Sequence, residues 1–190
     1  MKNALRIILF VFVMGTVSSA MLVGLNLYTT PLIERNEELK LKASVLDVFE
    51  IPYGESEIVN VFNKDIEVIQ KDKDKFYKTT AGAVAFEISG PGLWGQISGI
   101  ISLERDLKTI RKIKITHQEE TPGLGSRIAE ATFLQQFRNK EVLPKIIFMP
   151  EGKASGKNEV DAITGATGSS RAFEKLINAN LEKYLAILKG

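Results

Sequence analysis

The chain has 190 residues, 44% of them hydrophobic and 25% charged, which is typical of one globular domain with or without an appendage. Lys2 and Arg6 are the only charged residues before Glu34, so 23 basic and 23 acidic side chains remain from Glu34 onward. A body without net charge argues against nucleic-acid binding, which needs a concentrated basic face. The chain lacks Cys and has one His, His117, so we expect no disulfide and no metal site.

The N-terminal segment predicts the location of the protein. Ile7 to Ile33 is a run of 27 residues without a charged side chain, and roughly 20 helical residues cross the hydrocarbon core of a membrane. We therefore expect residues 1–33 to form one transmembrane helix that Pro31 ends. A cleaved signal peptide, with small residues at 17–20, and a buried helix are the alternatives. The short basic tail favours a body, residues 34–190, on the extracytoplasmic side.

Hydrophobic periodicity in the body predicts one α+β domain with a twisted, largely antiparallel sheet flanked by helices. An amphipathic helix is expected over 34–49, and a last helix that Ser169 or Ser170 caps. A further helix is expected over 127–138. The expected β segments are 58–62, 66–69, 76–80, 83–88, 97–103, 110–115 and 145–149.

The segment directly before the last predicted helix contains small and hydroxyl residues. It reads Asp161-Ala-Ile-Thr164-Gly165-Ala166-Thr167, followed by Gly168 and Ser169. Small residues allow a ligand to approach the backbone, and the free N–H groups of a helix N-terminus attract a phosphate. These residues alone are compatible with a phosphate site or with an ordinary capped helix start. A P-loop is excluded at 152–158, because its spacing is one residue short and Asn158 replaces the required hydroxyl.

This run resembles the flavinylation sequence of the FMN-binding domain family, which includes the RnfG subunit of Rnf-type electron transport complexes. The family also includes the NqrC subunit of sodium-translocating NADH:quinone reductases, the Nqr type. The resemblance implies that a flavin transferase joins the Thr167 hydroxyl to FMN as a phosphodiester. It also implies that Asp161, Thr164, Gly165 and Ala166 form the recognition frame, which Gly168 and Ser169 follow.

Two further segments are similar to family motifs. Glu120, Thr121, Pro122, Gly123, Leu124 and Gly125 resemble a loop that lies against the flavin. A Pro-Gly turn allows the backbone to approach a flat ring, and Leu124 offers an apolar contact. The stretch 90–95 contains Trp94 and resembles the Nqr branch; Trp94 packs near the cofactor or is an ordinary core or rim residue. For His117, a structural role and a flavin contact both remain open.

The resemblance implies an electron-relay subunit of an ion-translocating oxidoreductase in the cytoplasmic membrane of a prokaryote. Its partners would be the other membrane subunits, the flavin transferase and membrane lipid. No residue is expected to act as a general acid or base, because the redox chemistry belongs to the flavin. Two alternatives stay open: an anchored flavoprotein that works alone, and a non-redox module that holds a phosphate ligand. The sequence does not distinguish Rnf from Nqr, or sodium from protons.

Overall fold

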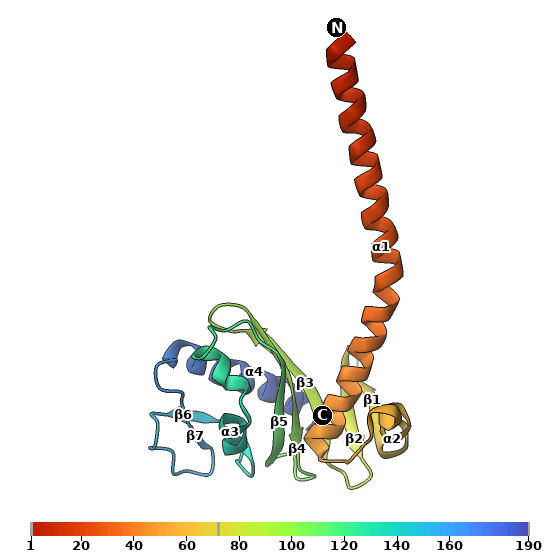
Figure 1. The fold of residues 1–190 in the computed structure, drawn as a ribbon. Helices are drawn as coiled ribbons and strands as arrows, with labels where there is room; N and C mark the ends of the chain where they lie inside the picture. Colours follow the sequence, from red (N-terminus) through yellow and green to blue (C-terminus); the bar gives the residue numbers. More distant parts are fainter. Residues whose placement is uncertain (1, 72, 190) are drawn as a thin grey trace. The chain divides into compact units, whose positions relative to one another are not determined.

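The computed structural model describes residues 2–71 and 73–189. By their internal contacts the residues form two compact units, 1–41 and 42–190. The second unit contains a five-stranded sheet, a two-stranded sheet and the helices around them (Figure 1). The expectation of an α+β domain with a largely antiparallel sheet is confirmed.

The first helix, α1, runs from Lys2 to Phe49. Its apolar N-terminal part is exposed, and the helix is long and apolar enough to cross a membrane. The prediction that Pro31 ends this helix is wrong, because the helix continues through it into the segment predicted as a separate helix. The hydroxyls of Thr29 and Thr30 donate to carbonyls one turn earlier, at 2.9 and 2.7 Å. A proline in this position removes one backbone hydrogen bond without ending the helix.

The larger sheet has the strand order β1-β2-β3-β4-β5, with every neighbouring pair antiparallel. The strands are β1 (Ile66–Lys71), β2 (Asp74–Thr79), β3 (Val84–Pro91), β4 (Gln96–Leu103) and β5 (Ile110–His117). The expected β segment at 58–62 is wrong: after the turn η1 (Glu55–Glu57), residues Ile58–Asp65 form the helix α2. Ile58 and Phe62 are four residues apart, so a helix places both on one face, where Phe62 is buried.

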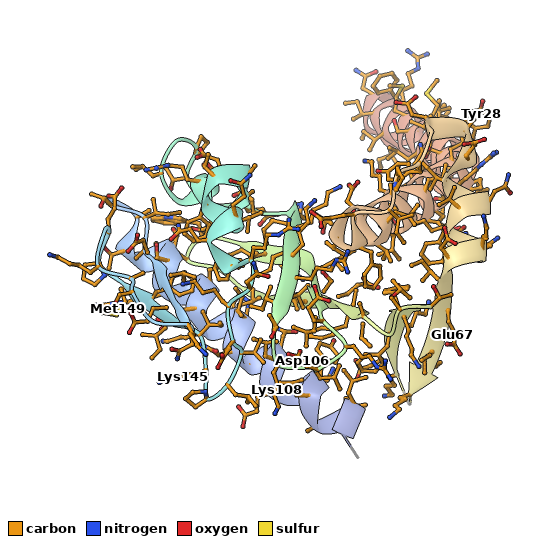
Figure 2. All side chains as sticks on the ribbon, turned by 90° about the horizontal axis from the view of Figure 1, so that it is seen from below. Tyr28, Glu67, Asp106, Lys108, Lys145 and Met149 are labelled. Atoms are coloured by element: carbon orange, nitrogen blue, oxygen red, sulfur yellow. The ribbon has the colours of Figure 1, made fainter. Side chains whose placement is uncertain are left out.

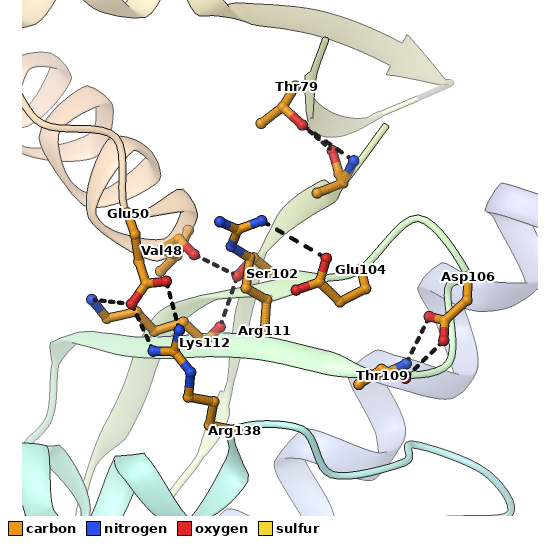
Figure 3. Close-up of polar contacts among 11 residues, drawn as sticks. Val48, Glu50, Thr79, Ser102, Glu104, Asp106, Thr109, Arg111, Lys112 and Arg138 are labelled. Atoms are coloured by element: carbon orange, nitrogen blue, oxygen red, sulfur yellow. Dashed lines mark hydrogen bonds and ion pairs between the residues drawn. The ribbon is translucent and has the colours of Figure 1, made fainter. Parts of the chain in front are cut away.

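The two faces of this sheet bury different elements. On one face the side chains of Phe76, Phe86 and Ile101 join the core that includes Phe173 of the last helix, α4 (Thr167–Lys189). The other face is covered by the end of α1, where the Ser102 hydroxyl donates to the Val48 carbonyl at 2.8 Å (Figure 3). Buried apolar residues from both sides make this a three-layer arrangement, with α4 fixed on the sheet.

Short helical turns replace the helix predicted over 127–138. They are η2 (Gly125–Ala129), α3 (Ala131–Leu134) and η3 (Gln135–Phe137). Glu130 has an extended backbone (φ −71°, ψ 140°), which interrupts the helical hydrogen bonds between η2 and α3. Phe133 and Phe137 are buried within these turns, but the spacing of apolar residues does not report a single extended residue between them and η2.

The smaller sheet pairs β6 (Ile147–Met149) with β7 (Glu159–Asp161) in parallel. β6 lies within the predicted segment 145–149, whereas β7 was not predicted. Figure 2 shows Met149 at the side of the domain opposite Glu67 of β1. Four phenylalanine rings, Phe133, Phe137, Phe148 and Phe173, contact one another at centroid distances of 5.6–6.2 Å. This cluster fixes α4 against β6, and so places the N-terminus of α4 beside the end of β7.

Candidate functional site

Thr167 is the first residue of α4, and its side chain is exposed. In the part of the chain that the structure describes, its hydroxyl has no hydrogen-bond partner. The nearby hydroxyls differ from it. Thr164 is exposed but hydrogen-bonded to a carboxylate, and Ser169 and Ser170 are buried. Among these four described hydroxyls, Thr167 alone is both exposed and unbonded.

The turn before α4 fixes the backbone at Thr167. Gly165 has φ +82°, a left-handed conformation that favours glycine. The N–H of Ala166 donates to the Ile163 carbonyl at 3.1 Å. Ser170 does not cap a helical N–H as predicted, because its Oγ accepts the N–H of Ile163 at 3.0 Å. The hydroxyl therefore fastens the turn to the first turn of α4.

A buried carboxylate joins the three segments that the sequence singled out. Glu120 is 4% exposed. Its Oε1 accepts the backbone N–H groups of Leu93 and Trp94 at 2.7 and 3.2 Å. Its Oε2 accepts the hydroxyl of Ser169 at 2.5 Å, so Ser169 is not a helix cap either. One side chain thus holds the 92–95 loop, the 120–125 loop and the N-terminus of α4 together.

Two glycines permit this close approach. A Cβ on Gly92 would overlap the Glu120 carboxylate, and would lie 2.8 Å from the Gly95 carbonyl. A Cβ on Gly125 would overlap the Ser169 hydroxyl, and would lie 2.8 Å from Glu120 Oε2. Real Cβ contacts are essentially never this short. The glycines in the two loop motifs are therefore explained by the space that Glu120 occupies.

The rest of the 120–125 loop is exposed. Thr121 accepts the N–H groups of Leu124 and Ser126 at 3.2 and 3.1 Å through its carbonyl, which closes a turn that also contains Pro122. Gly123 has φ +72°, and its N–H donates to the Ser126 hydroxyl at 3.0 Å. The turn presents Leu124 outward beside Gly165, because a Cβ on Gly165 would meet Leu124 Cδ2 at 3.7 Å.

Three large apolar side chains stand exposed around the start of α4. Leu93 is 52% exposed, Trp94 73% and Leu124 47%. A Cβ on Gly168 would meet Leu93 Cδ2 at 2.7 Å, so Leu93 lies directly against the backbone of the first helical turn. Exposed apolar side chains that cluster at one place mark a surface for a ligand or partner. The sequence indicated Trp94 and Leu124, but it gave no reason to separate Leu93 from the many other leucines.

His117 lies at the end of β5 and is exposed. Its Nε2 is 3.2 Å from Oε1 of Glu119, which is also exposed. A Cβ on Gly95 would overlap the Glu119 carboxylate, so this pair lies beside the loop that contains Trp94. Adjacent carboxylates in the sequence, Glu119 and Glu120, therefore have different surroundings, one in solvent and one in the interior.

Asp161 has a structural role in the loop before the site. Its Oδ1 accepts the N–H groups of Lys153 and Ala154 at 3.0 and 2.9 Å. The hydrogen bond from Ala154, with others from the same loop, holds the pKa of the Asp161 carboxyl below its usual range. Glu159 accepts two further N–H groups of this loop. The segment that resembles a P-loop is thus closed around two carboxylates, which agrees with its exclusion as a phosphate loop.

A cavity of about 420 Å³ lies beside Thr167. Its lining includes Thr164, Gly165 and Thr167 from the predicted segment, together with Glu151 and Arg171, which the sequence analysis did not single out. The remaining lining residues are Phe148, Met149, Pro150, Ala162, Ile163, Ser170 and Glu174. A polar cavity on one side of Thr167 and exposed apolar side chains on the other suit a ligand with a polar and an aromatic end.

Comparison with known proteins agrees with this geometry. The FMN-binding domain family matches residues 92–182, which include all three motifs. The RnfG subunit of the Na(+)-translocating ferredoxin:NAD(+) oxidoreductase complex of Acetobacterium woodii is 26% identical over 201 residues, covering 99% of this chain and 95% of that protein. The NqrC subunit of the Na(+)-translocating NADH-quinone reductase of Chlamydia trachomatis is 39% identical over 131 residues. That match covers 58% of this chain and 42% of the Chlamydia protein.

The fold also matches a solved structure. The crystal structure of the NqrC subunit of the Na(+)-translocating NADH-quinone reductase from Parabacteroides distasonis aligns with a TM-score of 0.72 and 24% identity. The alignment covers 84% of this chain and 96% of that one. The sheet, α4 and the loops around Thr167 define an FMN-binding domain. The chain belongs to the family that comprises the RnfG subunits of Rnf-type complexes and the NqrC subunits of Nqr-type complexes.

Proposed function

We propose that this protein is a redox subunit of an Rnf-type ion-translocating complex that carries FMN covalently on Thr167. The observation that carries the proposal is the Thr167 hydroxyl, which is exposed and unbonded at the N-terminus of α4 while its neighbours are buried or engaged. The positive end of a helix stabilises an attached phosphate. Attachment at Ser169 would require breaking its hydrogen bond to Glu120 in the interior.

The surroundings of Thr167 fit the remainder of FMN. Leu93, Trp94 and Leu124 offer exposed apolar surface to a flat ring, and the loops that carry them are tied to α4 through Glu120. A bound flavin supplies the chemistry, because it accepts two electrons and passes them on singly. The chain would hold the ring in place, exclude water from its apolar side and tune its potential through nearby hydrogen bonds.

The extent of similarity favours the Rnf type. The match to the Acetobacterium RnfG protein runs along 95% of its length, whereas the chain spans 42% of the length of the Chlamydia NqrC protein. A subunit of an Nqr-type complex is the second candidate, which the higher identity in the shared region supports. In either case the partners would be the other membrane subunits, with a flavin transferase during maturation.

We further propose that α1 anchors the protein in the cytoplasmic membrane of a prokaryote, in contact with lipid. Residues 1–33 would be the anchor and 34–190 the FMN-binding domain. The support is the exposed apolar surface of α1, which water would not tolerate over this length. The short basic tail with Lys2 and Arg6 favours an extracytoplasmic domain.

The test is the mass of the full-length protein from its native host, measured after denaturation and followed by peptide mapping. We expect the mass of FMN minus water on the peptide that contains Thr167. Thr167→Ala should abolish the covalent flavin and leave the fold intact, because the hydroxyl makes no hydrogen bond within the described residues. Thr164→Ala is the matched control, since it removes an exposed hydroxyl three residues away and should keep the flavin.

Two outcomes would contradict the proposal. Flavin that stays attached in Thr167→Ala would show that another residue carries it. An unmodified mass in a host that possesses the transferase would show that no covalent flavin forms, and would leave a reversible phosphate ligand as the function of this segment.

A further inference from the structure

The cavity beside Thr167 is lined by one cation. Arg171 is the only basic residue in its described lining, and the two carboxylates there, Glu151 and Glu174, are engaged elsewhere. Glu151 accepts a threonine hydroxyl, and Glu174 accepts a backbone N–H at 3.1 Å. Arg171 is exposed and, within the described residues, has no ion pair or hydrogen bond. An unpaired guanidinium that lines a cavity is available to an anionic ligand.

The position of Arg171 on α4 relates it directly to Thr167. The two residues are four apart, so they are neighbours on one face of the helix, with Cβ atoms about 5–6 Å from each other. Both line the same cavity, which confirms that their side chains share this face. The free N–H groups of the first helical turn lie at the same end and add positive partial charge.

We propose that Arg171 binds the flavin phosphate, so that the phosphodiester on Thr167 lies in this cavity. This inference rests on the proposed attachment of FMN to Thr167. A phosphate esterified to both the flavin and a threonine keeps one ionised oxygen, and a guanidinium pairs with phosphate oxygens through parallel N–H bonds. With the phosphate held on this side, the ring is directed to the exposed apolar side chains of Leu93, Trp94 and Leu124.

Arg171 is thus a positioning residue for the cofactor, and the next turn of the helix offers a matched control. Lys175 is also a basic and exposed residue of α4, but it does not line the cavity. Arg171→Gln removes the charge and keeps a side chain of similar reach. Arg171→Lys keeps the charge and loses the planar fork. Lys175→Gln removes one charge from the same helix without touching the cavity.

The experiment uses the full chain in detergent, loaded with FMN by co-expressed transferase, and measures the 31P resonance of the phosphodiester and the anisotropy of flavin fluorescence. Arg171→Gln should displace and narrow the resonance and lower the anisotropy, because the phosphate loses a fixed partner. Arg171→Lys should lie between wild type and Gln, and Lys175→Gln should match wild type. High salt should move the wild type toward the Gln variant, since salt screens exposed ion pairs.

Each failure has a separate meaning. If all variants load and show the wild-type resonance and anisotropy, the role of Arg171 is wrong while the covalent flavin stands. If wild-type protein is not modified at Thr167, the proposed function fails, and this inference fails with it. If Arg171→Gln alone fails to load, FMN and riboflavin are titrated into the Thr167→Ala chain with and without Arg171→Gln. A loss of about tenfold for FMN only supports the ion pair, and equal affinities overturn it.

Discussion

Glu120 and Glu50 both connect distant segments of the domain, but their surroundings differ. Glu120 is buried and accepts two backbone N–H groups and one hydroxyl, all of them uncharged donors. Glu50, at the end of α1, is partly exposed and pairs with Arg138 through two bonds of 2.6 and 2.8 Å, with Lys112 at 3.9 Å (Figure 3). The first carboxylate fixes the backbone around Thr167, whereas the second forms ion pairs that solvent and salt weaken.

This difference follows from burial. A buried donor that loses its acceptor cannot turn to water, so its loss costs more than the bond contributed. Exposed ion pairs gain little, because water solvates both charges when they separate. We therefore expect substitutions near Glu120 to affect stability and flavin together, and substitutions near Glu50 to affect stability slightly and flavin not at all.

The largest effect is expected for Glu120→Ala. The substitution leaves the N–H groups of Leu93 and Trp94 and the hydroxyl of Ser169 without their acceptor, at a cost of about 2–4 kcal/mol in the free energy of unfolding. The 92–95 loop should separate from α4, and flavin fluorescence should show a more mobile ring. Guanidinium unfolding of the full chain in detergent measures the first effect, and fluorescence anisotropy the second.

The neighbouring carboxylate provides the control for this variant. Glu119 is exposed, so Glu119→Ala should change the free energy of unfolding by less than about 0.5 kcal/mol. Glu120→Gln keeps an acceptor oxygen and should lose less stability than Glu120→Ala. If Glu119→Ala and Glu120→Ala are equally destabilising, Glu120 does not join the loops as described.

A smaller effect is expected for Gly125→Ala. The added Cβ overlaps the Ser169 hydroxyl, so the hydrogen bond from Ser169 to Glu120 must break or the loop must shift, at about 1–3 kcal/mol. Gly54→Ala is the matched control, because Gly54 has φ −91° and a Cβ there has no neighbour closer than 3.6 Å. Thermal unfolding of both variants measures the difference. Equal midpoints would show that the 120–125 loop has room for a methyl group.

Much of the fold could be predicted from the sequence because strands and long helices are recorded in periodicity. Residues 97–103 and 110–115 were expected to form a hairpin, and they do as β4 and β5. The same periodicity misled at 58–62, where a short apolar run is compatible with either a strand or a helix. Pro31 misled because its cost is one hydrogen bond, which a long apolar helix tolerates.

The candidate site was predicted as three separate motifs, and their contact could not be predicted. Nothing in the sequence shows that Glu120 reaches the backbone of Leu93 and Trp94, because this contact depends on the paths of two loops. Arg171 was missed for a related reason: one exposed arginine on an amphipathic helix gives no pattern. Its relation to Thr167 emerges only with the cavity that both residues line.

The smallest effect is expected for Arg138→Ala. Its guanidinium binds Glu50 in the solvent-exposed part of the domain, so its loss should lower the unfolding midpoint by about 1–2 °C and leave flavin content unchanged. The bond from Arg138 also holds the pKa of the Glu50 carboxyl below its ordinary value of 4.5. A carboxylate with a lowered folded-state pKa stabilises the protein above its unfolded pKa, and this contribution disappears as the pH falls through the folded value.

The pH dependence therefore separates this ion pair from simple loss of packing. The difference in midpoint between wild type and Arg138→Ala should be constant above about pH 5 and should shrink below it, as Glu50 becomes protonated. Thermal unfolding at several pH values, at low and at high salt, measures this difference. A difference that persists undiminished in acid would assign the effect to the alkyl part of Arg138 packing on the domain, since that contact does not titrate.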